Sequence, residues 1–178
     1  MPLNPSAMLS FNSILPLRLD FIWNYNIKTS IKGRDKKVAT SQEHIVRLEI
    51  PSEMKLIYIL DAVVSEILRE MQFDDEAVEQ ANLAIIEAGT NAILHGNGND
   101  PNKRVYFQFL VGEDKLTVIV KDEGKGFNPD KVPNPLDPEN LLNTAGRGIF
   151  LMRTLMDEVN YSKNGTEVQM VKYKSNES

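Results

Sequence analysis

The chain has 178 residues, a length typical of one domain with a short appendage. Its formal net charge of −5 argues against a dedicated nucleic-acid-binding protein, which would carry a basic face. No cysteine is present, which excludes disulfides, thiolate metal sites and a cysteine nucleophile.

The distribution of charge divides the chain in two, with a net +3 over residues 1–43 and −8 over residues 44–178. The first part includes an apolar stretch, residues 14–23, which Pro16, Arg18 and Asp20 interrupt. This stretch is too polar to span a membrane and lacks the layout of a secretion signal. We therefore predict an N-terminal extension and linker over residues 1–43, either loosely ordered or docked on the domain, in a cytoplasmic protein without a membrane segment.

The predicted domain, residues 44–175, begins with a strand and two helices. Apolar and polar residues alternate over His44–Ile50, a pattern typical of a half-buried strand. Ser52 is then expected to cap a helix whose apolar residues recur at intervals of three and four as far as Met71. Asp74 or Asp75 is expected to cap a second helix over about residues 75–95.

The later elements are two hairpins separated by a loop and a helix. Alternating residues predict a first hairpin over Val105–Val120, and Asn164-Gly165 marks the turn of the last one. Residues 128–145 contain four prolines and are predicted to be an irregular loop, followed by a helix over Ile149–Val159. The element order predicts an α+β fold, a two-layer sandwich with helices on one face of a mixed, mainly antiparallel sheet.

The first candidate for chemistry lies on the second predicted helix. Glu87, Asn91 and His95 follow one another at intervals of four residues and therefore share one helix face. A carboxylate can orient a water or hydroxyl, while a carboxamide oxygen can ligate a hard cation such as Mg²⁺. The spacing alone is equally compatible with a polar, solvated helix face.

Three further candidates are rich in glycine. Asp122 ends an apolar strand just before Gly124 and Gly126, where it can accept a hydrogen bond from an exocyclic amine such as that of adenine. Thr144–Arg153 opens a helix whose N-terminus favours an anion, and the last candidate is the turn Asn164–Thr166. Each alone is also explained as an ordinary turn or capping loop.

Other nucleotide-binding patterns are absent from the sequence. It contains no G-x-x-x-x-G-K-[ST] loop, no complete G-x-G-x-x-G and none of the H-R-D and D-F-G runs of the common protein kinases. The candidates are therefore not parts of a P-loop, a dinucleotide-binding fold or a protein kinase of the usual type.

Taken in order, these motifs resemble the N box and the glycine boxes of the GHKL ATPases. The runs EAGTNAILHGN (87–97) and GRGIFLMRTLMDEV (146–159) are similar to the RsbW-like anti-sigma factor serine kinases. The resemblance covers about residues 45–173, while residues 1–43 have no counterpart in it. It implies the ATP-binding fold of that superfamily, with ATP and Mg²⁺ as cofactors.

The resemblance also implies a role for each motif residue. Glu87 would be the general base and Asn91 the Mg²⁺ ligand. Asp122 would bind the adenine amine, and residues 128–145 would form a lid over the phosphates. The remaining nucleotide-binding residues implied are Gly124, Gly126, Gly146, Arg147, Gly148, Ile149 and Thr166.

As a function, the resemblance implies a serine/threonine protein kinase that phosphorylates a STAS-domain anti-anti-sigma factor and sequesters a sigma factor or related regulator. A homodimer is expected, without nucleic acid. Two alternatives stay open: a module that binds ATP and sequesters its partner without transferring phosphate, and a histidine-kinase catalytic domain. The second would need a phosphoacceptor histidine on a dimerising helix, whereas His44 falls on a predicted strand.

Overall fold

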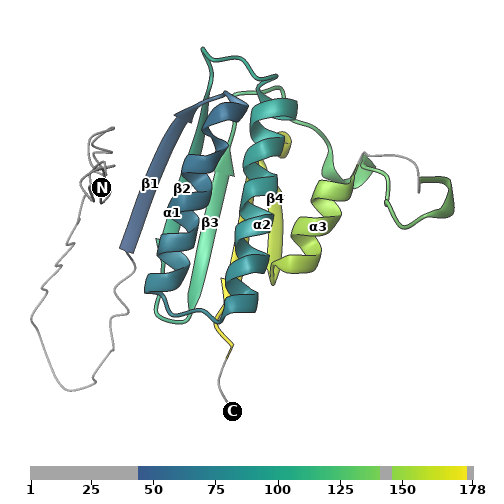
Figure 1. The fold of residues 1–178 in the computed structure, drawn as a ribbon. Helices are drawn as coiled ribbons and strands as arrows, with labels where there is room; N and C mark the ends of the chain where they lie inside the picture. Colours follow the sequence, from purple (N-terminus) through teal and green to yellow (C-terminus); the bar gives the residue numbers. More distant parts are fainter. Residues whose placement is uncertain (1–43, 141–145, 176–178) are drawn as a thin grey trace, which may run out of the picture.

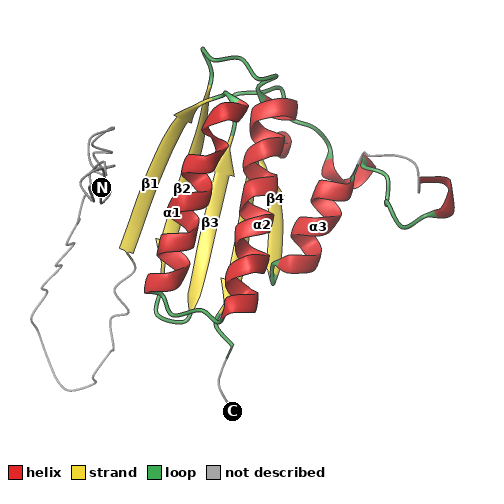
Figure 2. Ribbon diagram, viewed as in Figure 1, coloured by secondary structure: helices red, strands yellow, loops and turns green. Residues whose placement is uncertain are grey.

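The computed structural model describes residues 44–140 and 146–175, which form a sheet with its helices on one face (Figures 1 and 2). The strands are β1 (His44–Pro51), β2 (Arg104–Val111), β3 (Lys115–Lys121), β4 (Glu158–Ser162) and β5 (Glu167–Tyr173). The helices are α1 (Ile57–Glu70), α2 (Asp75–Asn91) and α3 (Arg147–Leu155). The predicted extension, residues 1–43, lies outside the described residues.

The strand order is β1-β2-β3-β5-β4, and every pairing between neighbours is antiparallel. Alternate residues of the two central hairpin strands face the helices and are buried, among them Phe107 and Phe109 of β2 and Val118 of β3. The predicted α+β sandwich is confirmed, but the sheet, predicted to be mixed and mainly antiparallel, is entirely antiparallel in the described residues. Its core lies between this face of the sheet and the helix layer.

The helices pack on the sheet through the residues that the apolar pattern selects. Leu60, Val64 and Leu68 of α1 are fully buried. Asp74 caps α2, as predicted, and its side chain accepts a hydrogen bond of 2.8 Å from the Ala77 N–H. A turn of π-helix, Ala92–Gly96, continues α2 to the end of the sheet where β1 ends and β2 begins.

Two local predictions are wrong. Ser52 does not cap a helix: it is buried, its hydroxyl donates to the Ile93 carbonyl over 3.3 Å, and α1 begins only at Ile57 after a 3₁₀ turn. The helix predicted to reach Val159 ends at Leu155, because Met156 is extended and β4 begins at Glu158. None of the helices in residues 44–140 and 146–175 has the length and apolar content that a transmembrane helix requires.

Candidate functional site

The N-terminus of α3 lies against the C-terminal half of α2. A Cβ built on Gly148 would lie 2.8 Å from Cδ of Glu87, nearer still to its Oε1, and 3.0 Å from Nδ2 of Asn91. Only a residue without a side chain allows this approach. The structure therefore brings together three of the predicted site residues, from two separate motifs.

The polar ends of Glu87 and Asn91 are available to a ligand. Both side chains are half-buried, and within the described residues neither makes a hydrogen bond or an ion pair. Their polar atoms are partly accessible and are not committed to a protein partner in the described residues, so both can bind a ligand. His95, third on this helix face by spacing, is exposed.

The Glu87 carboxylate also contributes to the electrostatics of the neighbouring strand β4. Burial raises the pKa of Tyr161 to about 12, and the charge of Glu87 acts in the same direction while Arg153 of α3 opposes it. A hollow of about 440 Å³ lies beside these groups, bordered by α3, β4 and Phe127. Its lining includes the start of the predicted lid, Asn128–Asp130, and Asn164 and Gly165 of the last candidate turn, but not Glu87, Asn91 or Asp122.

Asp122 lies directly after β3, at the end of the sheet that the π-helical turn reaches. A Cβ on Gly96 would lie 2.7 Å from both of its carboxylate oxygens, so the backbone of this turn packs against the carboxylate. Burial raises the pKa of Asp122, while the hydrogen bond from the Gly124 N–H and the charge of Lys103 oppose the rise. That 2.7 Å hydrogen bond to Oδ1 is the one it accepts within residues 44–140 and 146–175.

A hydrogen-bonded cluster that the sequence analysis missed holds Asp122 in place. Asn97 is buried, its Oδ1 accepts from the Glu123 N–H over 2.8 Å, and its Nδ2 donates to the Arg104 carbonyl over 2.8 Å. The Glu123 carboxylate in turn accepts from the Arg104 N–H and the Tyr106 hydroxyl, over 2.9 Å each, and both bonds lower the pKa of Glu123. The end of the π-helical turn is thereby tied to the strand end that carries Asp122.

The second glycine of this loop contacts the last hairpin. Gly126 has a φ of 73°, and a Cβ there would lie 3.0 Å from the Asn164 carbonyl carbon and 3.1 Å from Cγ2 of Thr166. The Phe127 N–H donates to the Asn164 carbonyl over 2.9 Å, and the Asp122 N–H donates to the Thr166 carbonyl over 3.0 Å. The predicted loop residues and Thr166 are therefore neighbours.

The Thr166 hydroxyl donates to the Lys163 carbonyl over 2.9 Å. This hydroxyl makes no hydrogen bond to the Asp122 carboxylate in the described residues, so the nucleotide-binding role of Thr166 stays a prediction.

The entry to α3 carries the other predicted phosphate-binding residues. Gly146 is the N-cap of α3 with a φ of 85°, a conformation that favours glycine. Arg147 is exposed, whereas Ile149 is half-buried and packs against the core. Of the predicted lid, residues 128–130 border the hollow beside β4 and the Pro133 carbonyl lies against Gly146. The chain then loops out beyond α3 (Figure 1), and residues 141–145 lie outside the described residues.

The donor set fits a magnesium nucleotide better than a metal bound by protein alone. No group of three or more metal-binding side chains lies together in the part of the chain that the structure describes. Mg²⁺ usually takes one or two protein oxygens and completes its coordination shell with phosphates and water. The amide oxygen of Asn91 can serve as such a protein ligand. Oδ2 of Asp122 accepts no hydrogen bond from the described residues and can accept one from a ligand amine.

Comparison with known proteins places this geometry in a family. The model of the histidine kinase-like ATPase domain matches residues 50–172. The serine-protein kinase RsbW of Bacillus subtilis (strain 168) is 34% identical over 139 residues, which cover 74% of this chain and 87% of that protein. The RsbW of Staphylococcus aureus (strain JH9) is 29% identical over 143 residues, which cover 75% of this chain and 89% of that protein.

Among solved structures, the chain is similar to the RsbU and RsbW domains of Rv1364c from Mycobacterium tuberculosis. The TM-score is 0.52 at 15% identity, and the match covers 74% of this chain and 33% of that longer chain. At this identity the likeness supports the fold alone.

Proposed function

This chain belongs to the histidine kinase-like ATPase domain family and is an RsbW-like serine-protein kinase that uses ATP, and we propose that it phosphorylates a STAS-domain antagonist and sequesters a sigma factor or related regulator. The same proposal includes Mg²⁺ as cofactor, a homodimer and a cytoplasmic location. It assigns the roles stated above to Glu87, Asn91 and Asp122.

The observation that carries the site assignment is the contact of Gly148 with Glu87 and Asn91. It sets a carboxylate and a carboxamide, neither of which has a partner among residues 44–140 and 146–175, beside a helix N-terminus that attracts phosphate. Phosphoryl transfer depends mainly on positioning and on neutralising charge. A bound Mg²⁺ would supply the neutralising charge.

Within this arrangement Glu87 accepts the proton of the substrate hydroxyl as the general base. Asn91 offers its amide oxygen to the metal. Asp122 accepts from the adenine amine, and Gly146 and Arg147 face the phosphates. These assignments agree with the unpartnered state of Glu87 and Asn91 in the described residues.

The histidine-kinase alternative finds no support in the fold. His44 lies on strand β1, paired with Val111 of β2, whereas a phosphoacceptor histidine would be on a dimerising helix. The sequestering-module alternative differs from a kinase only in the absence of phosphate transfer, so a transfer assay separates the two.

The test uses the full chain, labelled ATP and a candidate STAS-domain protein, with the variant Glu87→Gln. The variant keeps the shape of the side chain and should bind ATP normally, while transfer falls by roughly 10²–10⁴-fold. Glu79→Gln is the matched control, because Glu79 is an exposed carboxylate on the same helix. Transfer at the normal rate by Glu87→Gln would refute its role as base, and no transfer by the unmodified chain would refute the proposed STAS substrate.

A further inference from the structure

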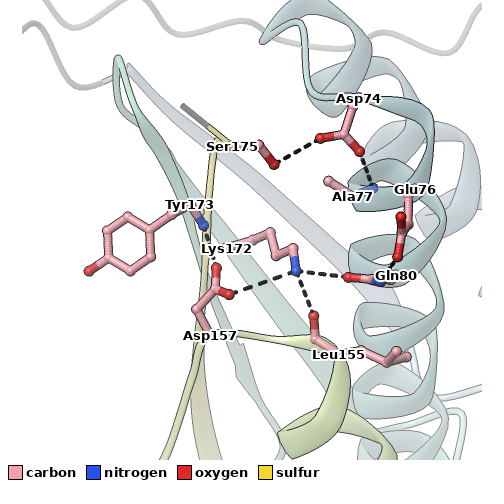
Figure 3. Close-up of polar contacts among 9 residues, drawn as sticks. All are labelled: Asp74, Glu76, Ala77, Gln80, Leu155, Asp157, Lys172, Tyr173 and Ser175. Carbon is pink, nitrogen blue, oxygen red and sulfur yellow. Dashed lines mark hydrogen bonds and ion pairs between the residues drawn. The ribbon is translucent and has the colours of Figure 1, made fainter. Parts of the chain in front are cut away.

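A buried lysine joins α3, α2 and the sheet at the end of the helix layer where α2 begins (Figure 3). Lys172 is on β5, after the buried residues Met170 and Val171 and before the exposed Tyr173. Its own side chain is only 11% exposed. Residues 168, 170 and 172 face the helices by strand alternation. A charged group therefore stands where the pattern of the strand calls for an apolar one.

The partners of this ammonium group come from three segments. Nζ of Lys172 donates to Oε1 of Gln80 on α2 and to the carbonyl of Leu155, the last residue of α3, over 2.9 Å each. Oδ1 of Asp157, in the turn between α3 and β4, lies 3.8 Å away. Burying an ammonium group is costly unless it is paired, and here the pairing links the ends of separate elements.

The bond to Leu155 bears directly on α3. The last carbonyls of a helix have no partner within the helix, and a lysine that binds them also complements the negative end of the helix dipole. α3 has nine residues, and a helix this short is unstable unless tertiary contacts hold it. Met152 is its one fully buried residue, and Ile149 and Leu155 pack partly buried against the core, so the contacts at its two ends add to a small apolar interface.

The other end of α3 is the end that meets Glu87. Gln80 precedes Glu87 by seven residues, or two turns of α2, so both lie on the same side of that helix. α2 and α3 are therefore joined twice: through Lys172 at one end and through the contact of Gly148 with Glu87 at the other. Loss of the first junction would leave α3 joined to α2 only through the second and through its apolar contacts.

We propose that Lys172 is a positioning residue of the kinase, whose ammonium group holds the C-terminal end of α3 on α2 and so sets where Gly148 meets Glu87. The inference rests on the proposed function, because it concerns the geometry of phosphate transfer. Lys172 itself is remote from Asp122, which follows the opposite end of the neighbouring strand β3. Adenine recognition is therefore independent of the lysine.

The test replaces Lys172 by methionine, which has a similar length but no charge and no hydrogen-bond donor. Since a misplacement of about 1 Å can cost 10²-fold in rate, kcat for transfer should fall at least tenfold, while the affinity for ADP stays within about threefold. Gln80→Met removes only the link to α2 and should lose part of kcat. Lys174→Met is the control, because this nearby lysine has no side-chain partner in the described residues.

A purely structural role predicts a different result. Lys172→Met removes two hydrogen bonds but leaves no buried charge behind, because the remaining Asp157 side chain is 39% exposed, so the variant should lose some stability and stay folded. A variant that is less stable but transfers phosphate with the normal kcat when folded would overturn the proposal.

Hydrogen exchange of the α3 amides separates this proposal from the kinase assignment, because it needs neither nucleotide nor partner. In Lys172→Met the amides of residues 147–155 should exchange at least tenfold faster, with β2 and β3 unchanged. If the unmodified chain transfers no phosphate, the proposed function fails. Faster exchange in Lys172→Met would still show that Lys172 holds α3 in place. Unchanged exchange in α3 would overturn it in either case.

Discussion

Gly148→Ala tests the contact between α3 and Glu87 most directly. The added Cβ would lie 2.8 Å from Cδ of Glu87, inside the 3.0 Å that real Cβ atoms keep. The group in its way is the far end of a flexible side chain, so the carboxylate moves by about 1 Å and the fold is spared. Alanine also favours a helix over glycine by about 1 kcal/mol, so the free energy of unfolding should stay equal or rise. Transfer should nevertheless fall by about 10²-fold, because the base is displaced.

The assay pairs urea unfolding with transfer of labelled phosphate to the same STAS-domain partner. Thr154→Ala serves as control, since Thr154 is an exposed residue on the same helix and its replacement should leave transfer unchanged. Normal transfer by Gly148→Ala would refute the argument that transfer depends on the present position of the Glu87 carboxylate. A large decrease in the free energy of unfolding would refute the second argument, that the Glu87 side chain can move aside at little cost.

Three further predictions concern the adenine end of the site. Asp122→Asn should weaken ATP binding by roughly 1.5–3 kcal/mol and reduce the preference for ATP over GTP, because an amide presents donors as well as an acceptor. Calorimetric titration with both nucleotides measures the two affinities, and unchanged affinities would exclude the adenine contact. Because burial raises the pKa of Asp122 above the ordinary 3.8, ATP affinity in the unmodified chain should fall as the pH drops through that raised value, and Asp122→Asn should not share this fall. Asn97→Ala should lower the free energy of unfolding by about 1–3 kcal/mol, since it leaves the Glu123 N–H and the Arg104 carbonyl without their partner; urea unfolding at the normal midpoint would contradict this.

The elements that the sequence predicts well are those on which independent local signals agree. Asp74 precedes a run of small apolar residues with helical spacing, and it caps α2 as expected. The turn signals after Val111 and at Asn164 lie between alternating runs, and both hairpins form. Short-range chemistry decides these features, so no knowledge of distant contacts is needed.

The predictions fail where a residue distant in sequence determines the local structure. Serine is a preferred N-cap residue, but the Ser52 hydroxyl donates to the Ile93 carbonyl, 41 residues away in sequence. Residues 149–159 keep an apolar pattern that suits helix and strand alike, and pairing of β4 with β5 ends the helix at Leu155. Asn97 looks like one more turn residue in a loop rich in glycine and asparagine. Only the fold reveals that it binds Arg104 and Glu123.

The glycines of the site illustrate the same limit. In the sequence, Gly124 and Gly148 suggest room for a ligand, because glycine lets a backbone approach one closely. In the structure the nearest groups are the protein's own: Gly124 lies against the backbone of Gly96, which itself lies against the carboxylate of Asp122, and Gly148 lies against the carboxylate of Glu87. Backbone thus covers one side of each carboxylate without supplying a competing side chain, and for Asp122 this burial raises the pKa. A methyl group at Gly96 or Gly148 would therefore displace a functional carboxylate before it disturbed the core, and activity should be lost ahead of stability.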